Sequence, residues 1–492
     1  MPLIPLQMPP GMYANGTDLE AAGRWRDGNL VRWVNGSLRP VGGWRLRKDS
    51  AFAAPVRGCV AWEDNSGDRW FAAGTYNKLY VMSAANTVSD ITPSGLTEGS
   101  ADATVNFGYG GSFYGTGYYG APRPDTGNYA EATTWAVDTW GQYLVACSVD
   151  DGKLYEWQLN TSSAAVAISN APTGNLSLVT TEERFLFALG AGGNPRKVQW
   201  CDREDNTTWT PAATNEAGDI ELQTAGQIMA GVRTRGQTLI LTDQDAHTAT
   251  YVGPPFVYGF ERTGTSCGLV ARCAVSSTDY GVFWMGQRSF FGYNGSTVSE
   301  LKCDVLDRVF EDINASQISK AHSVVNGQFG EVWWFYPSSA SNECDKYVAF
   351  SYKEGWWHTG DLDRTAGIDR GVFKYPFWVS STGNVYEHEI GLNFDDASIY
   401  AESGPISLGV GDNVMACTRL IPDEETQGEV TATFKTRFHP NDTERSYGPY
   451  SMSNPTSVRF TGRQVRMRVD GVALKDFRVG VMRLEAQQGG RR

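Results

Sequence analysis

A short turn followed by an alternating apolar strand recurs along this chain, and this feature constrains the fold more than any other. The turns contain Asn35-Gly36, Asn77-Lys78, Asp151-Gly152, Asn294-Gly295 and Gly383-Asn384. Asn, Asp and Gly tolerate the positive φ angles that tight hairpin turns require. The sequence therefore predicts the same antiparallel hairpin several times over.

Seven apolar strands recur at intervals of about 35 to 75 residues, at 69–73, 142–147, 184–189, 238–242, 281–285, 331–336 and 377–379. An array of four-stranded sheets closed into a β-propeller fits this spacing, because radial closure protects the sheet edges that an open array exposes. The repeats are imperfect, so roughly five to eight blades remain open. A run of separate β-sandwiches is the structural alternative.

The composition supports a mainly β fold. The chain has 492 residues with 55 Gly, 16 Trp, 22 Tyr and 22 Phe, which favours short strands joined by tight turns and little helix. No stretch approaches the roughly 20 apolar residues that a membrane-spanning helix needs. Prolines interrupt the opening residues, which lack a basic region, so we expect no secretory signal and a chain that stays in the cytosol where it is made.

The pattern divides the chain into three regions. We expect an N-terminal arm with a hairpin at 1–50, a propeller body at 51–395 and a small sandwich-like β domain at 396–492. In the last region, arginines alternate with apolar residues, which indicates one buried face and one wet, positive face. One helix is predicted at 304–313, where apolar residues share a face, and it should pack on the propeller rim.

Charge is distributed unevenly. The formal charge is -13, the wrong sign for a protein that grips nucleic acid through its whole surface. Residues 429–492 carry about +6, residues 1–50 about +3, and the segment between them about -22, with 23 basic against 45 acidic residues. The candidate basic docking face comprises Arg459, Arg463, Arg466, Arg468 and Arg478. A nucleic-acid contact, docking onto acidic protein neighbours and simple solvation all remain open for it.

The segment 106–129 is rich in Gly and Tyr and contains almost no charge. It cannot bury a conventional core, so we expect a long insertion that projects from the propeller body. Such a loop can seal a pore, contact a neighbouring subunit or touch a cell surface. A plain flexible connection between blades is the alternative.

Catalytic signatures are largely absent. Gly115 to Gly120 matches the letters G-x-G-x-x-G, but it neither ends a strand nor opens a helix, and no P-loop, H-E-x-x-H, EF-hand or G-x-S-x-G motif occurs. Eight cysteines without a C-x-x-C pair are expected to be buried free thiols. His247 with Asp243 and Asp245 is a weak metal set that a solvated turn explains equally well. We therefore expect no cofactor, no metal and no enzyme activity, with a glycosidase carboxylate pair as the minority alternative.

Four segments together carry a family resemblance: residues 10–17, the hairpin from Arg32-Trp33 to Gly42-Gly43-Trp44, the Gly/Tyr insertion, and residues 133–147. With them the chain resembles the nozzle, or tail tubular protein B, family of short-tailed bacteriophages. The resemblance implies a structural virion protein of the tail, a propeller-containing subunit that assembles as a hexameric ring. It also implies neighbours: a tail adaptor protein, tail spikes or fibres, and a needle or plug protein.

This resemblance gives the charged and aromatic segments expected roles. An acidic lumen would let double-stranded DNA pass during ejection without sticking, and the basic C-terminal region would hold an acidic adaptor or spike surface. Candidates for a gate or tip loop are Tyr109, Phe113, Tyr114, Tyr118 and Tyr119.

The main rival function is a propeller lectin or host-receptor adhesin, in which exposed aromatic rings stack on sugars. Against it, Trp62, Trp70, Trp284, Trp333 and Trp334 lie in or beside predicted strands, where packing in the core is the commoner role.

Overall fold

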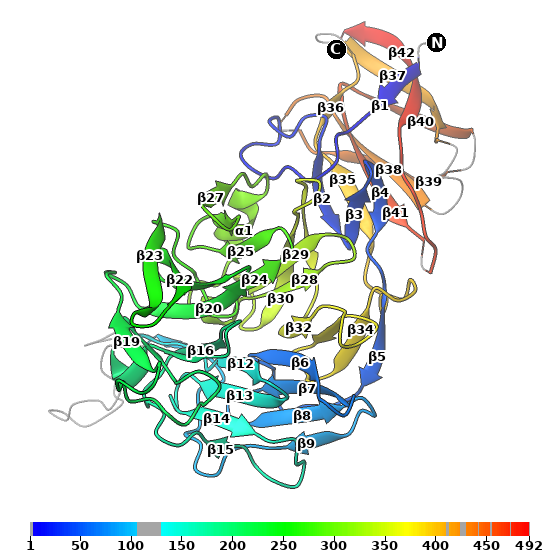
Figure 1. The fold of residues 1–492 in the computed structure, drawn as a ribbon. Helices are drawn as coiled ribbons and strands as arrows, with labels where there is room; N and C mark the ends of the chain where they lie inside the picture. The colour runs from blue at the N-terminus through cyan, green and yellow to red at the C-terminus, as the bar shows by residue number, and fades with distance from the viewer. Residues whose placement is uncertain are drawn as a thin grey trace, which may run out of the picture.

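The computed structural model describes residues 3–105, 129–409, 413–423, 430–440, 442–452, 455–472 and 474–491. Two parts are evident: a ring of four-stranded antiparallel sheets, and a smaller two-sheet sandwich beside it (Figure 1). None of the helices in these ranges could cross a membrane.

Six sheets of the ring are each built from four strands that are consecutive in the sequence. The first three blades are β6 (Cys59–Glu63), β7 (Arg69–Gly74), β8 (Leu79–Ser83) and β9 (Val88–Asp90); β12 (Trp135–Trp140), β13 (Tyr143–Ser148), β14 (Leu154–Trp157) and β15 (Val166–Ala167); and β16 (Ser177–Thr180), β17 (Leu186–Leu189), β18 (Lys197–Trp200) and β19 (Gly218–Glu221). The next three are β20 (Ile228–Thr234), β21 (Gln237–Thr242), β22 (Asp245–Gly253) and β23 (Val257–Thr265); β24 (Val275–Thr278), β25 (Gly281–Met285), β26 (Phe290–Tyr293) and β27 (Val298–Leu301); and β28 (His322–Asn326), β29 (Glu331–Pro337), β30 (Cys344–Ser351) and β31 (Trp357–Asp361).

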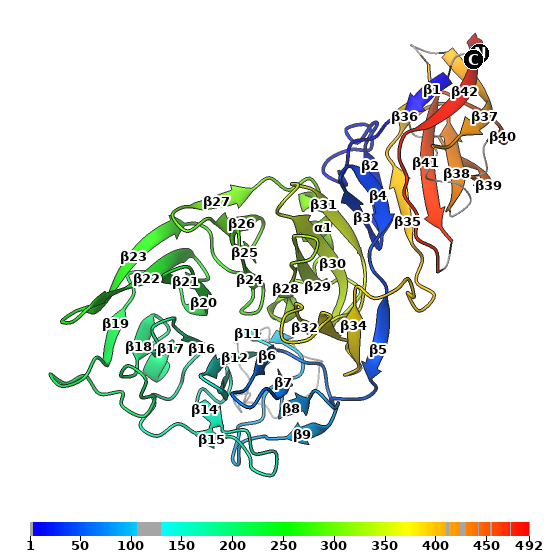
Figure 2. The ribbon, with the colours of Figure 1, turned by 45° about the vertical axis from the view of Figure 1, so that its right-hand side comes forward.

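The seventh blade closes the ring. It consists of β32 (Ala366–Ile368), β33 (Phe377–Val379) and β34 (Val385–His388), completed by β5 (Trp44–Lys48) from the N-terminal region. The innermost strands contact one another in the order β6, β12, β16, β20, β24, β28, β32 and back to β6 (Figure 2). The body is therefore a closed seven-bladed β-propeller, and the alternative of separate sandwiches is wrong for it.

The local predictions from turns and strands are confirmed. Each of the seven apolar strands predicted from the sequence overlaps the second strand of a blade, β7, β13, β17, β21, β25, β29 or β33. The first hairpin joins β3 (Val31–Val34) to β4 (Ser37–Pro40) through Asn35 and Gly36, with φ angles of 51° and 78°. The helix α1 (Leu306–Asp312) lies within the predicted segment. The described residues also contain two short 3-10 turns, η1 (Ala191–Gly193) and η2 (Ile318–Lys320).

The sandwich contains strands from both ends of the chain. One sheet has the order β1 (Leu3–Leu6), β42 (Met482–Arg491), β37 (Asn413–Ile421), β40 (Thr456–Gly462). The other has the order β2 (Trp25–Asn29), β35 (Tyr400–Ser403), β41 (Gln464–Gly471), β38 (Val430–Arg437), β39 (Arg445–Ser451), with β36 (Ile406–Ser407) also pairing with β41. The inner faces meet through apolar side chains, such as the stacked rings of Phe434 and Phe460 with centroids 4.8 Å apart.

The sequence predicted an N-terminal arm at residues 1–50. In the structure, these residues do not form a separate arm. β1 and β2 are strands of the sandwich, and β5 is the outer strand of the seventh blade. Pairing with a distant partner strand decides this placement, and no local pattern in residues 1–50 encodes it. The propeller thus needs residues 44–48, and the sandwich needs residues 3–29.

A buried ion-pair cluster fastens the N-terminal hairpin to the propeller. The Arg32 side chain, 2% exposed, places Nη2 2.5 Å from Glu389 Oε1 and 3.2 Å from Glu331 Oε2. Its guanidinium also lies 3.8 Å from the ring centroid of Phe329. Burial alone would raise the pKa of Glu331, but the positive charge of Arg32 and the Trp333 indole N–H, which donates to the carboxylate at 3.0 Å, lower it to about 2. One cation from the hairpin therefore neutralises carboxylates of the sixth and seventh blades.

Replacing Arg32 with Met should destabilise the protein by about 3–5 kcal/mol, because two buried carboxylates lose their cation. Urea unfolding followed by tryptophan fluorescence measures this change. Arg69→Met is the matched control, since Arg69 pairs with Glu63 at the surface, where both side chains are 49% exposed. The surface pair should contribute less than about 1 kcal/mol. Equal effects of the two substitutions would contradict the role assigned to Arg32.

The same cluster predicts a loss of stability in acid. Because the folded pKa of Glu331 lies below its ordinary value of 4.5, its contribution is fully present above pH 4.5 and disappears as the pH falls towards 2. Urea unfolding between pH 6 and pH 2.5 should show a steeper loss for the wild-type chain than for Glu331→Gln. Parallel curves for the two chains would be evidence against this linkage.

Candidate functional site at the propeller axis

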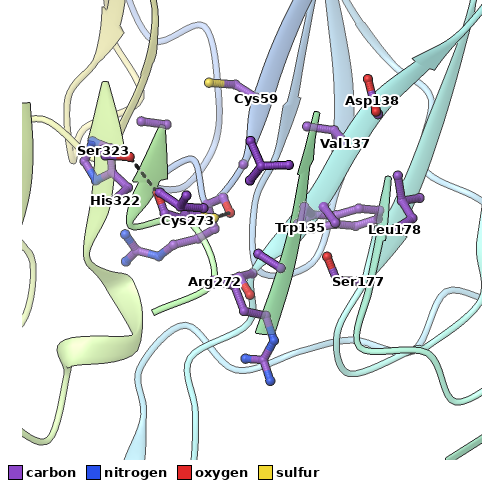
Figure 3. Close-up of a pocket in the computed structure, with 18 of the residues that line it drawn as sticks. Cys59, Trp135, Val137, Asp138, Ser177, Leu178, Arg272, Cys273, His322 and Ser323 are labelled. Carbon is purple, nitrogen blue, oxygen red and sulfur yellow. Dashed lines mark hydrogen bonds between the residues drawn. The ribbon is translucent and has the colours of Figure 1, made fainter. Parts of the chain in front are cut away.

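A cavity of about 250 Å³ lies on the propeller axis and is lined by residues at or near the innermost strands of all seven blades (Figure 3). Small apolar side chains such as Ala136, Val179 and Ala230 form much of its wall. Several polar side chains line the cavity close to the first residues of the inner strands. Among them are Arg57, Cys59, Thr134, Arg272, Cys273, Lys320 and His322.

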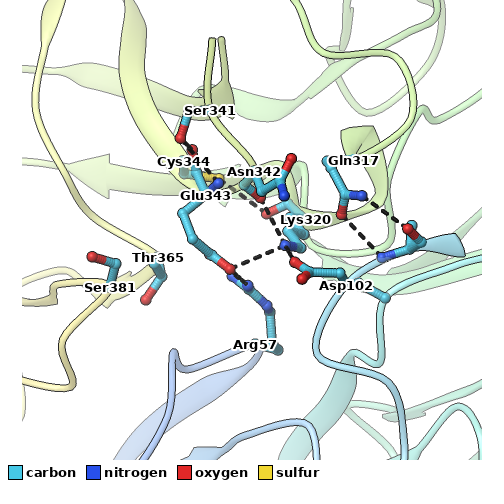
Figure 4. Close-up of polar contacts among 12 residues, drawn as sticks. Arg57, Asp102, Gln317, Lys320, Ser341, Asn342, Glu343, Cys344, Thr365 and Ser381 are labelled. Carbon is cyan, nitrogen blue, oxygen red and sulfur yellow. Dashed lines mark hydrogen bonds and ion pairs between the residues drawn. The ribbon is translucent and has the colours of Figure 1, made fainter. Parts of the chain in front are cut away.

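Three cations line this cavity, and each pairs with a carboxylate that is not part of the lining. Arg57 Nη2 donates to Glu343 at 2.6 and 2.5 Å, and Arg272 Nη1 donates to Glu131. Lys320, whose side chain is fully buried, pairs with Asp102, with Glu343 at 3.0 Å and with the Asn342 carbonyl at 2.7 Å (Figure 4). The three cations are therefore neutralised by carboxylates that lie outside the cavity lining.

The two described ends of the Gly/Tyr insertion are anchored beside this cavity. They pair as β10 (Thr104–Val105) and β11 (Tyr129–Ala130). The Gln317 side chain bonds the backbone of Ala103 at 3.0 and 2.9 Å, and the Ala132 amide donates to Ser319 at 3.2 Å. Asp102 and Glu131 add the ion pairs to Lys320 and Arg272. The described ends of the insertion therefore lie beside the cavity-lining residues Lys320 and Arg272.

The predicted gate residues Tyr109, Phe113, Tyr114, Tyr118 and Tyr119 lie outside the described residues. Their role as gate, tip or connector stays a prediction.

The thiols and the imidazole of the cavity are in forms unsuited to nucleophilic catalysis at neutral pH. Burial raises the pKa of Cys59 to about 12 and that of Cys273 to about 11, so both remain thiols. Burial and the nearby charge of Arg57 lower the pKa of His322 to about 3, so its ring is neutral. Burial also raises the pKa of Asp138, although its ion pair with Arg233 at 2.7 Å acts in the opposite direction.

The solvated turn expected around His247 is wrong for Asp245 and His247, which are buried at the start of β22. His247 Nε2 lies 3.1 Å from Asp245 Oδ1, and that carboxylate also accepts from the hydroxyls of Thr224 and Thr242. Asp243 accepts from the backbone amide of Gln227. Among the described ranges, no three His, Cys, Asp or Glu side chains are grouped as metal ligands.

The structure does not gather the five predicted docking arginines on one face. Arg459 is exposed on β40, in one sheet of the sandwich, and Arg463 follows that strand. Arg466 and Arg468 project from β41, in the other sheet, and point away from the shared core. Arg478 is exposed in the segment that leads to β42.

Two of these arginines are occupied by acidic residues of the same chain. Arg466 pairs with Asp18 and with Glu444 at 2.7 Å. Arg468 pairs with Asp470 at 2.8 Å and lies 3.7 Å from the Tyr400 ring centroid. Alternation along the strands was visible in the sequence, but the pairing of Arg466 with Asp18 and Glu444 was not, because these partners come from other segments of the chain.

The charge asymmetry is different when the charges of the propeller and of the sandwich are counted separately. Residues 44–395, which contain the propeller, hold 25 basic and 40 acidic residues, a formal charge of -15. Residues 1–43 and 396–492, which contain the sandwich, hold 17 basic and 15 acidic residues, a formal charge of +2. The contrast is therefore between an acidic propeller and a nearly neutral sandwich.

Sequence reasoning missed Arg57, Thr134, Arg272 and His322 as a group. They come from four blades, and only closure of the ring brings them to one cavity. The single shared signal is position, because each lies at or within a few residues of the start of an innermost strand.

Alkylation tests the chemistry of the axial thiols. At pH 8, maleimide should modify Cys59 and Cys273 on the order of a hundredfold more slowly in the native protein than in urea, because their raised pKa values leave little thiolate. Peptide mass spectrometry after timed quenching measures both sites separately. Rapid labelling of either site in the native protein would show a reactive thiolate and reopen the case for catalysis.

A scan against protein-family models finds no match, and a search of curated proteins finds none either. Among solved structures, the chain is similar to a virginiamycin B lyase from Staphylococcus aureus, with 7% identity, a TM-score of 0.42, and coverage of 70% of this chain and 96% of that one. It is also similar to YCF48 bound to a D1 peptide, with 8% identity, a TM-score of 0.38, and coverage of 71% and 97%. These likenesses concern the propeller fold, and no activity is carried over from them.

Proposed function

We propose that this chain is a structural virion protein, a subunit of a ring-shaped tail nozzle through which double-stranded DNA is ejected. In this role it would also carry spikes, fibres or a plug. The observation that carries the proposal beside the sequence resemblance is the acidic propeller, with a formal charge of -15. A duplex slides past such a surface without phosphate contacts that must later be broken.

The conduit in this proposal lies between subunits and not within one. The axial cavity of about 250 Å³ has the volume of about eight liquid water molecules, far too little for a duplex. A ring of several copies is therefore required, and six is the number that the resemblance implies. The nearly neutral sandwich, which carries both ends of the chain, is the unit available to bind an adaptor or a spike.

The lectin or adhesin function receives little support from the tryptophans, although Phe256 and Tyr280 are exposed. Of the sixteen tryptophans, fourteen are buried, and Trp70 and Trp356 are half-buried. Stacking on a sugar ring needs an exposed aromatic face. The tryptophans instead fill the blade cores, as where Trp333 lies 5.2 Å from Trp378 between neighbouring blades.

An exposed apolar tip offers a contact for assembly. The long hairpin of β22 and β23 ends at Val252 and Phe256, which are 57% and 78% exposed. Such side chains at the end of a projecting element are typical of contact surfaces. A contact between this tip and a different surface of the next copy would be heterologous, the type that closes into rings.

Light scattering with negative-stain imaging of the same fraction tests the assembly. Hollow rings of about six copies are expected, if necessary only after the adaptor is added as a template. The double variant Val252→Ser/Phe256→Ser should weaken ring formation while leaving the urea midpoint unchanged, because both side chains are exposed. Val166→Ser is the matched control, since Val166 is 69% exposed on β15 in another blade.

Other outcomes separate the rival functions. A persistent monomer that binds defined glycans on an array, with no rings in the presence of adaptor, would favour the adhesin. Retention of a DNA duplex by the isolated protein at physiological salt would contradict the repelling surface.

A further inference from the structure

The end of the β22–β23 hairpin, residues 252–256, forms an apolar tip. Four of its five residues, Val252, Pro254, Pro255 and Phe256, are exposed, and the fifth is Gly253. The next residue, Val257, is buried at a φ of 62°, a conformation that β-branched residues rarely adopt. Backbone strain of this kind persists where a particular shape is needed for function. An exposed apolar surface held in a strained shape is typical of a contact site.

The tip stands on a rigid base of packed aromatic rings. Tyr258, two residues beyond Phe256, lies with its ring centroid 5.3 Å from that of Phe185 and 4.8 Å from that of Phe187. Its backbone amide donates to the Phe256 carbonyl at 2.7 Å. A surface that is already ordered loses little conformational entropy when it binds.

A second apolar feature is a pocket of about 560 Å³, which we call the N-terminal pocket. It lies between residues 6–10, the β3–β4 hairpin and residues 479–481, and none of the described residues that line it is charged. Trp25 and Trp33, with ring centroids 6.3 Å apart, are the buried aromatic part of the lining. The accessible wall includes the exposed Pro9 and Val481 and the half-buried Met8 and Pro10.

The tip and the N-terminal pocket lie too far apart to meet within one chain. Strand β23 lies on one side of the propeller, whereas β1 and β4, which border the pocket, lie on the other side (Figures 1 and 2). Any contact between the two therefore joins two copies. Because the two surfaces differ, such a contact is heterologous and can close into a ring.

The charges of the two units favour this contact over one between propellers. The unit that carries the tip has a formal charge of -15, and the unit that carries the pocket has +2. Two propellers in contact would oppose like charges, whereas a tip in the N-terminal pocket places an acidic unit beside a nearly neutral one. The tip itself contains no charged residue, so its entry into an uncharged pocket removes no charge from water.

We propose that the tip of one copy docks into the N-terminal pocket of the next copy. The inference rests on the proposed function, which requires contacts between copies, and it identifies the surface that receives the tip. The Phe256 ring enters the pocket, and Val252 and the two prolines cover its rim beside Val481. Each copy then uses its tip on one neighbour and its pocket on the other.

Two complementary variants of the full chain test this contact. Val252→Ser/Phe256→Ser removes the tip and keeps the pocket, whereas Val481→Asp keeps the tip and places a carboxylate at the pocket. Val481 is 43% exposed, so the free chain should tolerate the carboxylate, but docking would bury it unpaired. Each variant alone should associate at least about tenfold more weakly than the wild-type chain. An equimolar mixture should form a heterodimer and no ring, because it retains one working tip and one working pocket, and sedimentation velocity measures this.

Leu474→Asp is the matched control. Leu474 is 69% exposed, belongs to the same C-terminal region and is not part of the pocket lining. It should associate like the wild-type chain, which separates loss of the pocket from the effect of an added charge. Urea midpoints of all variants should be unchanged, which separates loss of the contact from a folding defect.

A photoreactive side chain identifies the receiving surface directly. Phe256→p-benzoylphenylalanine keeps an aromatic ring at the tip. Irradiation of the full chain, with the adaptor added where rings require it, should cross-link the tip to residues 6–10 or 479–481 of another copy. Peptide mass spectrometry of chains mixed from light and isotope-labelled preparations distinguishes links between copies from links within one.

The outcomes separate this inference from the proposed function. Rings that form equally well with Val481→Asp, or cross-links from the tip to any other surface, would overturn the docking and leave the nozzle standing. Heterodimers from the mixed variants, with no rings from the wild-type chain even with adaptor, would support the docking and contradict the nozzle.

Discussion

Closure of the sheet ring is the constraint on which the rest of this structure depends. Each blade covers a face of the next blade. Completion of the seventh blade therefore covers the last exposed sheet face of the ring. That blade takes its outer strand, β5, from residues 44–48, and Glu387 on β34 is held by Arg45 and Arg47. The buried Arg32 cluster then fixes the preceding hairpin to the sixth and seventh blades. The axial cavity exists only because this circle is shut.

Local chemistry made much of the propeller predictable. Turn pairs such as Asn35-Gly36 and Asp151-Gly152 carry their own backbone preference, and apolar strands such as 331–336 report burial directly. The blade number was not predictable, since short edge strands such as β15, with two residues, leave almost no pattern. The strand composition of the seventh blade and of the sandwich could not be predicted for another reason. β5 and β1 pair with strands some 340 and 480 residues away, and pairing at that distance has no local signal.

The axial site illustrates the same limit for function. Arg57 and Arg272 look like ordinary surface cations in the sequence, and Thr134 and His322 carry no motif. Their significance comes from closure of the ring, which brings them to one cavity at the axis. By contrast, the arginines of β41 attracted attention in the sequence, yet Asp18, Glu444 and Asp470 already occupy them. Charge in a sequence therefore indicates a binding surface only after the internal partners have been counted.

The origin of β5 has a consequence for the way this protein is made on the ribosome. Residues 44–48 emerge early, but their partner β34 emerges only some 340 residues later. At a typical elongation rate of about 5–20 residues per second, this strand waits for roughly 20 to 70 seconds. During that time the apolar side chains destined for the seventh blade, Trp44 among them, have no permanent neighbour. Nascent chains of this protein are therefore most exposed to mispairing and to chaperone capture before the last blade leaves the exit tunnel.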